Sequence, residues 1–291
     1  MAETSSAWSL EAFTASDGYR WQFRRYQCRP GPEAAAHVVC LHGIQSHAGW
    51  YEHSCTALSE AGYEVSFLDR RGSGVNAEAR GDASSFRRLV DDVAEFLADL
   101  RSRRPITSSV PIFLLGISWG GKLAGALEIM HPGLIDGLAL LCPGFQPRVR
   151  PSLRERVRIA IARLVSPSRL FPIPLSDAEL FTATEKWQDF IRKDPLGLRQ
   201  ATARLLIESV RLDLYLRRRP EQIKIPVLLM LAEHDRIIDN GRTRRFVNQF
   251  ASPDKEIFEY AGAAHTLEFE PDPNQFIADL RRWLDRHSRK H

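Results

Sequence analysis

The stretch 112–125 constrains the fold most, because four apolar residues run into a segment of small residues with one serine at the junction. The junction, Gly-Ile-Ser-Trp-Gly at 116–120, matches the G-x-S-x-G pattern of a strand that turns sharply into a helix. Such a turn strains the backbone of Ser118, and side chains at positions 116 and 120 would collide with the neighbouring strand and helix. The sequence therefore predicts a buried strand, a helix and a serine held between them.

A serine in this position needs partners before it can act as a nucleophile. Its hydroxyl is unreactive near neutral pH unless an imidazole takes the proton and a carboxylate orients the imidazole. In proteins with this strand-to-helix corner, the acid and then the histidine follow the serine along the chain. The alternative interpretation of the motif is a buried glycine-rich turn in which Ser118 has only a structural role.

Short apolar strands alternate with helical patterns around this corner. This alternation is typical of an α/β fold, in which helices cover both faces of a mostly parallel sheet. The first strand alternates aromatic and polar residues, as a half-exposed antiparallel strand would. We predict strands at 19–27, 37–41, 64–68, 112–117, 137–142, 225–231 and 255–260, and helices at 55–62, 84–103 and 273–287.

The alternation stops between residues 145 and 220. That segment shows no convincing strand and has helical patterns at 153–165, 177–191 and 196–216. Such an insertion would cover the side of the sheet where the serine emerges. We predict a core of residues 1–144 and 221–291 with a helical cap at 145–220. Apolar residues near the start of the cap are candidates for the substrate pocket: Phe171, Ile173 and Leu175.

The predicted acid and base follow the last two strands. Asp235 comes directly after the apolar strand 225–231, in competition with Glu233 and Asp239. His265 lies in a loop of small residues after the strand 255–260. Along the chain, Asp235 and then His265 follow Ser118, which is the required order. Both are expected at the edge of the sheet where Ser118 lies. We therefore predict a Ser118, His265 and Asp235 triad.

The segment after the strand 37–41 is expected to lie beside the serine. Its backbone N–H groups and the amide of Trp119 are placed to form an oxyanion hole, which binds the negative oxygen of a reacting carbonyl. His42 is interpreted as a turn histidine bonded to the backbone, with a catalytic group as the alternative, and it is also a candidate for the substrate pocket. The turn Asp-Arg-Arg-Gly-Ser-Gly at 69–74 lacks phosphate-loop spacing and is interpreted as a structural bend.

With these motifs the chain resembles the monoacylglycerol lipase and lysophospholipase group of the α/β-hydrolases. The resemblance covers most of the chain. It is carried by His42-Gly43 with His47, Gly49 and Tyr51, by Gly72-Ser-Gly74, by Gly116-Ile-Ser-Trp-Gly-Gly121, by Asp194-Pro-Leu196, by His234-Asp-Arg236 and by Gly262-Ala-Ala-His265.

The resemblance implies an eight-stranded sheet and hydrolysis of carboxylic esters through an acyl-enzyme, with no metal and no organic cofactor. It also implies that the amides of Ile44 and Trp119 form the oxyanion hole. The chain departs from the group at Trp119, where methionine is usual, at Ser46, where an acidic residue is common, and at Trp50, where a basic residue is common. The expected substrate is an acylglycerol, a lysophospholipid or a related small acyl ester.

Basic charge is concentrated in the predicted cap. Residues 145–220 contain 16 Lys or Arg and 8 Asp or Glu, whereas the whole chain has a formal net charge of +4. A charge confined to one region adds little support for nucleic-acid binding. The helix 153–165 combines an apolar stripe with arginines, so it either contacts an anionic membrane surface or packs on the sheet with a solvated basic face.

The remaining composition predicts a soluble cytoplasmic protein of unknown oligomeric state. No apolar run is long enough to span a bilayer, and residues 1–6 contain no basic segment or apolar run. The cysteines have no C-x-x-C spacing, so we expect buried thiols in a reducing compartment. They are Cys28, Cys40, Cys55 and Cys142.

Two other functions are compatible with this sequence. A peptidase, amidase, thioesterase or acyltransferase would use the same triad on a different acyl compound. A protein of this fold with a disabled site would only bind a ligand. The predicted triad argues against the second function, and a panel of ester, thioester and peptide substrates separates the first from an esterase.

Overall fold

The computed structural model describes residues 7–29, 34–103 and 110–288. The N-terminal residues 1–6, used above for the expected location, lie outside that part. The main sheet contains β1 (Ser9–Thr14), β2 (Arg20–Tyr26), β3 (His37–Leu41), β4 (Glu64–Leu68), β5 (Ile112–Ile117), β6 (Gly137–Leu141), β9 (Val227–Ala232) and β10 (Lys255–Tyr260).

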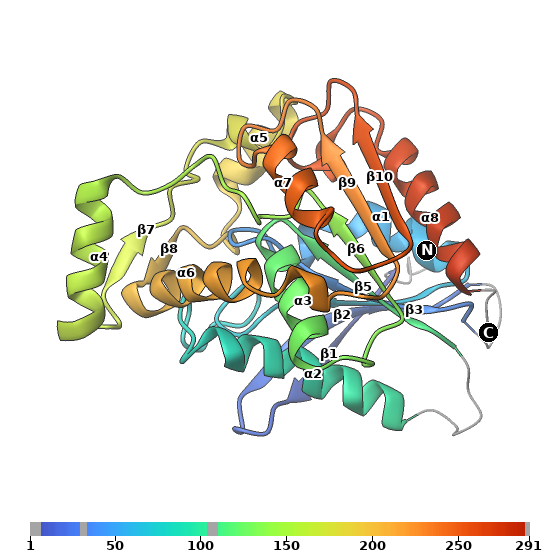
Figure 1. Ribbon diagram of the computed structural model, residues 1–291, viewed down its shortest axis with the longest axis horizontal. Helices are drawn as coiled ribbons and strands as arrows, with labels where there is room; N and C mark the ends of the chain where they lie inside the picture. The colour runs from blue at the N-terminus through green and yellow to red at the C-terminus, as the bar shows by residue number, and fades with distance from the viewer. Residues whose placement is uncertain (1–6, 30–33, 104–109, 289–291) are drawn as a thin grey trace, which may run out of the picture.

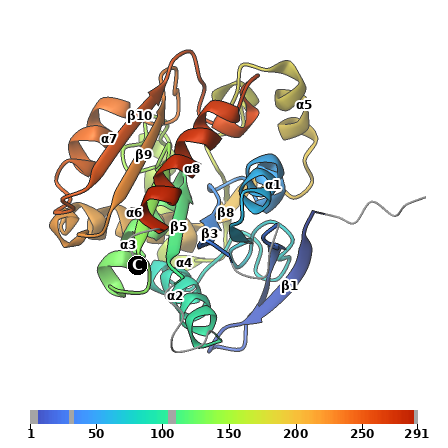
Figure 2. The ribbon, with the colours of Figure 1, turned by 90° about the vertical axis from the view of Figure 1, so that its right-hand side faces the viewer.

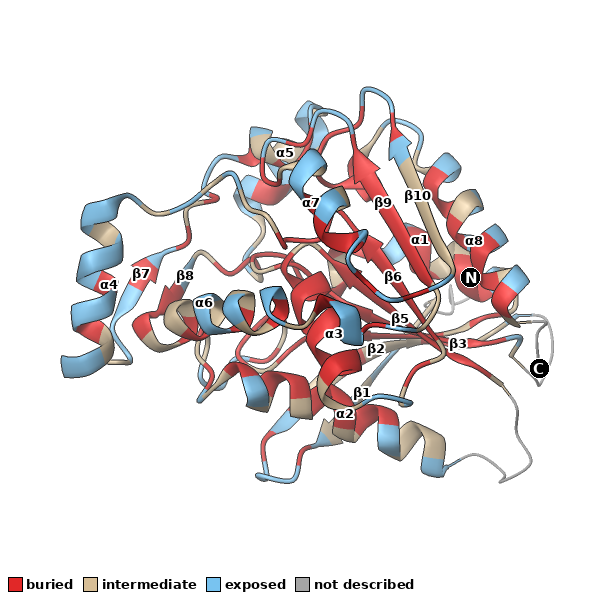
Figure 3. Cartoon of the chain, in the orientation of Figure 1, coloured by how far each residue is buried: buried red, intermediate tan, exposed pale blue. Residues whose placement is uncertain are grey.

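These strands form one eight-stranded sheet in the order β1-β2-β4-β3-β5-β6-β9-β10 (Figure 1). Strand β2 is antiparallel to both of its neighbours, and all other pairs are parallel. Every residue of β3, β5, β6 and β9 is buried (Figure 3), which explains their nearly continuous apolar sequences. The expected mostly parallel eight-stranded sheet is confirmed.

Helices cover both faces of the sheet (Figure 2). On one face α1 (Glu52–Glu60) packs against α8 (Asn274–Ser288), and on the other α2 (Phe86–Ser102) packs against α3 (Trp119–Met130). The Ser85 hydroxyl accepts a hydrogen bond from the Arg88 amide and so stabilises the first turn of α2. The part of the chain that the structure describes also has, outside residues 145–219, α7 (Asn240–Val247) and the 3-10 helices η1 (Ala48–Tyr51), η3 (Pro220–Gln222) and η4 (Leu267–Phe269).

The corner between β5 and α3 has the strained geometry that its glycines predict. Ser118 has φ of 51° and ψ of −120°. A Cβ on Gly120 would lie 2.4 Å from the Leu41 carbonyl oxygen, and a Cβ on Gly116 would lie 2.7 Å from the Gly121 Cα. Because these contacts are with backbone atoms, the only way to relieve them is to move β3 or α3. The two glycines are therefore required for the close packing that holds Ser118 in place.

Residues 145–220, called the cap segment from here on, connect β6 to β9. The division of the chain into a core and a separate helical cap stays a prediction. The segment contains a short antiparallel pair of strands, so the prediction that it has no strand is wrong. Its elements are α4 (Leu153–Val165), β7 (Leu170–Pro172), η2 (Ala178–Leu180), α5 (Glu185–Lys193), β8 (Gln200–Thr202) and α6 (Ala203–Arg217).

Two helices of the cap segment are shorter than their patterns predict. The pattern at 196–216 becomes α6 only from Ala203, because residues before it pair in β8 and the Thr202 hydroxyl caps the helix by accepting the Leu205 amide hydrogen. The pattern at 177–191 divides into η2 and α5. Apolar periodicity continues across these breaks, so local hydrogen bonds decide the boundaries.

Several hydrogen bonds and ion pairs attach the cap segment to the core. The Asp194 carboxylate lies 3.1 Å from His47 Nε2 and accepts a 2.7 Å hydrogen bond from the Trp50 indole N–H. The Lys122 ammonium on α3 lies 2.7 Å from the Asp213 carboxylate on α6. Trp50 therefore takes part in the contact between core and cap segment.

The four cysteines are free thiols, of which three are buried and Cys28 is half-buried, so the expectation of burial is wrong for Cys28 alone. Among the described residues, no helix combines the length and the apolar character needed to cross a membrane.

Candidate active site

Three side chains from separate parts of the chain meet at one edge of the sheet. Ser118 lies between β5 and α3, Asp235 follows β9, and His265 follows β10. The Ser118 Oγ lies 2.9 Å from His265 Nε2, and His265 Nδ1 lies 2.7 Å from Asp235 Oδ2. The structure thus brings the three residues predicted for the triad into one chain of hydrogen bonds, with the imidazole between hydroxyl and carboxylate.

The Asp235 side chain is fully buried, and its two oxygens have separate partners. Its Oδ1 accepts hydrogen bonds from the amides of Ile237 and Ile238 at 2.8 and 2.9 Å, so Oδ2 is left for the imidazole. The two competing acids have other partners. Asp239 caps α7, and Glu233 accepts a hydrogen bond from an amide in the loop after β10.

The loop that carries His265 is attached at both sides of the imidazole. The amide of Ala264 donates to the Glu270 carboxylate at 2.8 Å, and the amide of Thr266 donates to the Phe181 carbonyl at 2.9 Å. The Phe181 ring also packs edge-on against the imidazole, with centroids 6.1 Å apart. Phe181 belongs to the cap segment, so the cap segment helps to position the histidine. The sequence contains no pattern that distinguishes Phe181 from the other phenylalanines.

The loop after β3 packs directly against the serine. A side chain at Gly43 would come within 3.3 Å of the Ser118 Cβ. The amides of Ile44 and Trp119 have no hydrogen-bond partner among the residues that the structure describes. Two unpaired amides next to a serine are suited to bind a negatively charged oxygen. Ser46 Oγ accepts the Gly43 amide hydrogen at 3.0 Å and so holds this loop from within.

Comparison with known proteins shows the family to which the chain belongs. A family model described as serine aminopeptidase S33 (Hydrolase_4) matches residues 32–272. The chain belongs to this hydrolase family. A monoacylglycerol lipase of Mycolicibacterium smegmatis is 27% identical over an alignment of 296 positions, which covers 97% of this chain and 99% of the relative.

Two further comparisons agree. A phospholipase of Bacillus subtilis is 26% identical over 254 residues, covering 86% of this hydrolase and 95% of the relative. The solved structure of a soluble variant of monoglyceride lipase from Saccharomyces cerevisiae has a TM-score of 0.83 at 22% identity, covering 98% of this chain and 97% of that chain. The α/β-hydrolase fold and the resemblance to the monoacylglycerol lipase group are confirmed.

The residues predicted for the substrate pocket do not lie together in this hydrolase. The prediction for Phe171 is wrong, because its ring completes a separate apolar cluster between α4 and α6 at the outer end of the cap segment. Ile173 and Leu175 pack in the main core cluster and stay predictions for the pocket wall. His42 is buried with Nδ1 2.7 Å from the Gly43 carbonyl oxygen, which confirms its interpretation as a turn histidine.

Cys142 adds a contact to the acid that the sequence did not indicate. It follows β6 with φ of 41°, and its thiol lies beside the Asp235 carboxylate. Burial, and then the negative charge of Asp235, raise the pKa of this thiol well above its usual range, so it is neutral at neutral pH.

Among the described residues, a single group could offer three ligands to a metal ion, and it consists of Cys142, Asp235 and His265.

Proposed function

We propose that Ser118, His265 and Asp235 are the nucleophile, the general base and the orienting acid of a hydrolase that cleaves esters of apolar acyl groups. The observation that carries this proposal is the hydrogen-bonded chain from the Ser118 Oγ through the imidazole to Asp235. The chain is a carboxylic ester hydrolase, as its lipase and phospholipase relatives indicate. Its substrate and the roles of these residues are the proposed part.

The geometry supports the following reaction. The Ser118 Oγ bonds to the ester carbonyl carbon while its proton moves to His265 Nε2, and the amides of Ile44 and Trp119 bind the resulting oxyanion. The bond to the leaving alcohol breaks as Nε2 returns the proton to the alcohol oxygen. Water then attacks the carbonyl carbon of the acyl-enzyme and gives a proton to Nε2. Nε2 returns this proton to the Ser118 Oγ as the bond between Oγ and the acyl carbon breaks and the carboxylic acid leaves. Each oxyanion donor should contribute about 3–4 kcal/mol to the transition state.

The surroundings of Ser118 favour an apolar acyl group. The side chains of Trp119 and Phe181 are buried next to the serine and the imidazole, and Ile44 is half-buried beside them. Ser46, where an acidic residue is common in the related lipases, is uncharged and accepts hydrogen bonds from the Gly43 amide and the Tyr51 hydroxyl. We therefore propose monoacylglycerols, lysophospholipids or similar single-chain esters as substrates.

A substrate panel tests this proposal. We expect turnover of p-nitrophenyl and glycerol esters, with kcat/KM at least about tenfold higher for an eight-carbon acyl chain than for acetate, because each buried CH₂ contributes roughly 0.8 kcal/mol. The same panel contains thioesters and amino acyl p-nitroanilides. Faster turnover of a thioester or an anilide than of every ester would assign the triad to the alternative acyl chemistry.

The cap segment presents an apolar surface that the core does not cover. Leu153, Val157, Ile161 and Leu164 lie on one face of α4, because their spacing follows the helical repeat. Their exposed fractions are 74%, 51%, 56% and 84%, and α4 is pale blue over most of its length in Figure 3. We call this set the α4 apolar stripe.

The opposite face of α4 makes the contacts with the rest of the protein. Ile159 and Ala162 are buried there, against Phe171 and Ala203. The prediction that this helix packs on the sheet is therefore wrong, because α4 packs on α6 and β7 at the outer end of the molecule (Figure 1). The α4 apolar stripe faces solvent.

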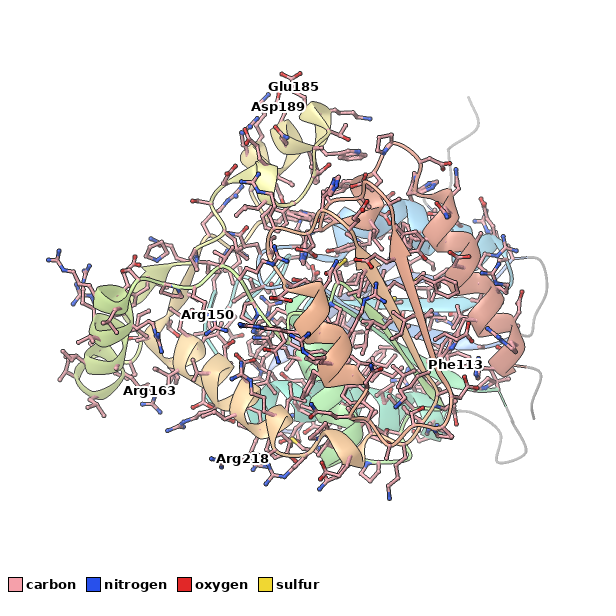
Figure 4. All side chains as sticks on the ribbon, turned by 45° about the horizontal axis from the view of Figure 1, so that its top comes forward. Phe113, Arg150, Arg163, Glu185, Asp189 and Arg218 are labelled. Atoms are coloured by element: carbon pink, nitrogen blue, oxygen red, sulfur yellow. The ribbon has the colours of Figure 1, made fainter. Side chains whose placement is uncertain are left out.

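Arginines flank the α4 apolar stripe on both sides. On an ideal helix, Arg154 and Arg158 lie along one edge, and Arg156 and Arg163 lie along the other. Arg163 is labelled beside α4 in Figure 4, where nitrogen atoms surround this end of the cap segment. An apolar stripe with basic borders fits the interface of an anionic bilayer. We propose that the cap segment contacts such a surface.

Co-sedimentation with vesicles tests this contact. Wild type is expected to bind vesicles containing phosphatidylglycerol at low salt and to bind less as salt rises. A double replacement, Ile161→Ser with Leu164→Ser, should weaken binding about tenfold or more, since each side chain loses on the order of 1 kcal/mol of interfacial burial. The control is Leu10→Ser, which changes a 47% exposed leucine on β1. Equal binding by the double variant and wild type would exclude the α4 apolar stripe as the contact.

A further inference from the structure

Arg70 is a buried cation that holds the loop beside Ser118. It follows β4 and is 9% exposed. Its Nη1 donates a 2.7 Å hydrogen bond to the Gly43 carbonyl oxygen, and its Nη2 donates a 2.5 Å hydrogen bond to the Ile44 carbonyl oxygen. One guanidinium thus binds two successive carbonyls of the loop after β3.

The bond to Gly43 controls the direction of the neighbouring amide. The Gly43 carbonyl and the Ile44 N–H belong to the same planar trans peptide, so they point in opposite directions. His42 also packs against this peptide, because its Nδ1 lies 2.7 Å from the Gly43 carbonyl oxygen and 3.0 Å from Arg70 Nη1, and its Nε2 accepts the Arg70 amide hydrogen at 3.3 Å. A peptide bound on its carbonyl side by Arg70 and His42 has its N–H fixed on the other side.

The same guanidinium contacts Trp119, whose amide is the second donor of the proposed oxyanion hole. Its Cζ lies 4.9 Å from the centre of the Trp119 ring, in cation–π contact. The Trp119 indole N–H also donates a 2.8 Å hydrogen bond to Ser209 on α6. Arg70 therefore touches both residues whose amides are proposed to bind the oxyanion.

The positive charge of Arg70 is buried without an acidic partner among the described residues. Within residues 7–29, 34–103 and 110–288, no carboxylate lies within ion-pair distance of its guanidinium. Burial lowers the pKa of Arg70 to about 9, and the group is still protonated at neutral pH. A buried cation without an acidic partner destabilises the folded protein unless its hydrogen bonds are satisfied, and here backbone carbonyls satisfy them.

We propose that Arg70 is a positioning residue for the oxyanion hole, which orients the Ile44 amide through the Gly43 carbonyl and supports Trp119 through its ring. This proposal rests on the proposed function of Ser118. It assigns a role in the reaction to the turn at 69–74, which the sequence analysis interpreted as a structural bend. Lysine cannot reproduce this role, because its point charge cannot bind two carbonyls in a planar fork.

Steady-state kinetics on a p-nitrophenyl ester, together with inhibition by an apolar trifluoromethyl ketone, test the proposal. The ketone forms a negatively charged adduct with a serine nucleophile, so its Ki reports on the oxyanion hole. For Arg70→Met we expect kcat to fall about 100-fold with KM within about threefold, and Ki to rise by a similar factor. For Arg70→Lys we expect changes of about tenfold in kcat and Ki.

The matched control is Arg80→Met. Arg80 also donates to backbone carbonyls, those of Gly74 and Leu196, but it does not contact the loop after β3. Its replacement should leave kcat and Ki within about threefold of wild type.

Thermal unfolding of each variant shows whether it is folded. A folded Arg70→Met enzyme with wild-type kcat and Ki would overturn the proposal. If Arg70→Met does not fold, the same outcome in Arg70→Lys would overturn it. A rise in KM alone, with kcat and Ki unchanged, would also contradict it. A wild-type protein with no ester turnover would refute the proposed function and this inference together.

Discussion

Replacing Ser118 with alanine is expected to lower kcat for a p-nitrophenyl ester by about 10⁴-fold or more, because the nucleophile of an acyl-enzyme mechanism is lost. The substitution removes one oxygen atom, whose recorded side-chain partner is the His265 imidazole. Alanine keeps the Cβ atom of residue 118, whose position leaves little room for a side chain at Gly43. We therefore expect the free energy of unfolding to change by less than about 1 kcal/mol.

Turnover is measured spectrophotometrically, and folding by circular dichroism and thermal melting. Retention of more than about one per cent of wild-type kcat in a folded Ser118→Ala protein would mean that another group performs the attack.

The second large effect is expected for Asp235→Asn. The asparagine Oδ1 can still accept the amides of Ile237 and Ile238, so the loop keeps its two hydrogen bonds. Its NH₂ group then faces His265 Nδ1, and it favours the imidazole tautomer with a proton on Nε2. That nitrogen can no longer take the Ser118 proton. We expect kcat to fall about 10⁴-fold with little change in KM.

Asp239→Asn is the matched control. Asp239 lies four residues further along and caps α7, a position where asparagine is as favourable as aspartate. Its kcat should stay within about twofold of wild type. If the Asp239 variant lost activity and the Asp235 variant kept it, the acid would have to be reassigned.

The parts of the fold that the sequence predicted are those where local sterics leave few choices. Gly116 and Gly120 were expected because a side chain at either position would collide, and the structure places backbone atoms at 2.7 and 2.4 Å from the missing Cβ atoms. The positions of Asp235 and His265 follow from chain order and from the alternation of strands and helices. Parallel strands end at the same edge of a sheet, so residues that follow them meet in space.

The features that the sequence did not predict depend on contacts between distant segments. Arg70 looked like part of a structural bend, because nothing in its neighbourhood indicates that its side chain reaches the loop after β3. Phe171 was assigned to the pocket by composition, whereas its position is decided by the packing of α4 on α6. The short pair β7 and β8 has three residues in each strand, too few for an alternating pattern to show.

The exposure of the α4 apolar stripe is another feature that the sequence alone did not predict. The sequence showed an apolar stripe bordered by arginines, and both a packed helix and a membrane-facing helix have that pattern. The position of α4 at the outer end of the cap segment, with Ile159 and Ala162 as its buried contacts, shows only that the stripe faces solvent, and contact with a membrane stays a prediction.

The central claim is that the Ser118 hydroxyl is the nucleophile activated by His265. It is tested most directly by treating the full-length protein with a fluorophosphonate and locating the adduct by peptide mass spectrometry. We predict a single adduct on Ser118, formed rapidly by wild type and slowed strongly in Asp235→Asn. An unmodified Ser118 in a folded wild-type protein, or an adduct on a different residue, would contradict the claim.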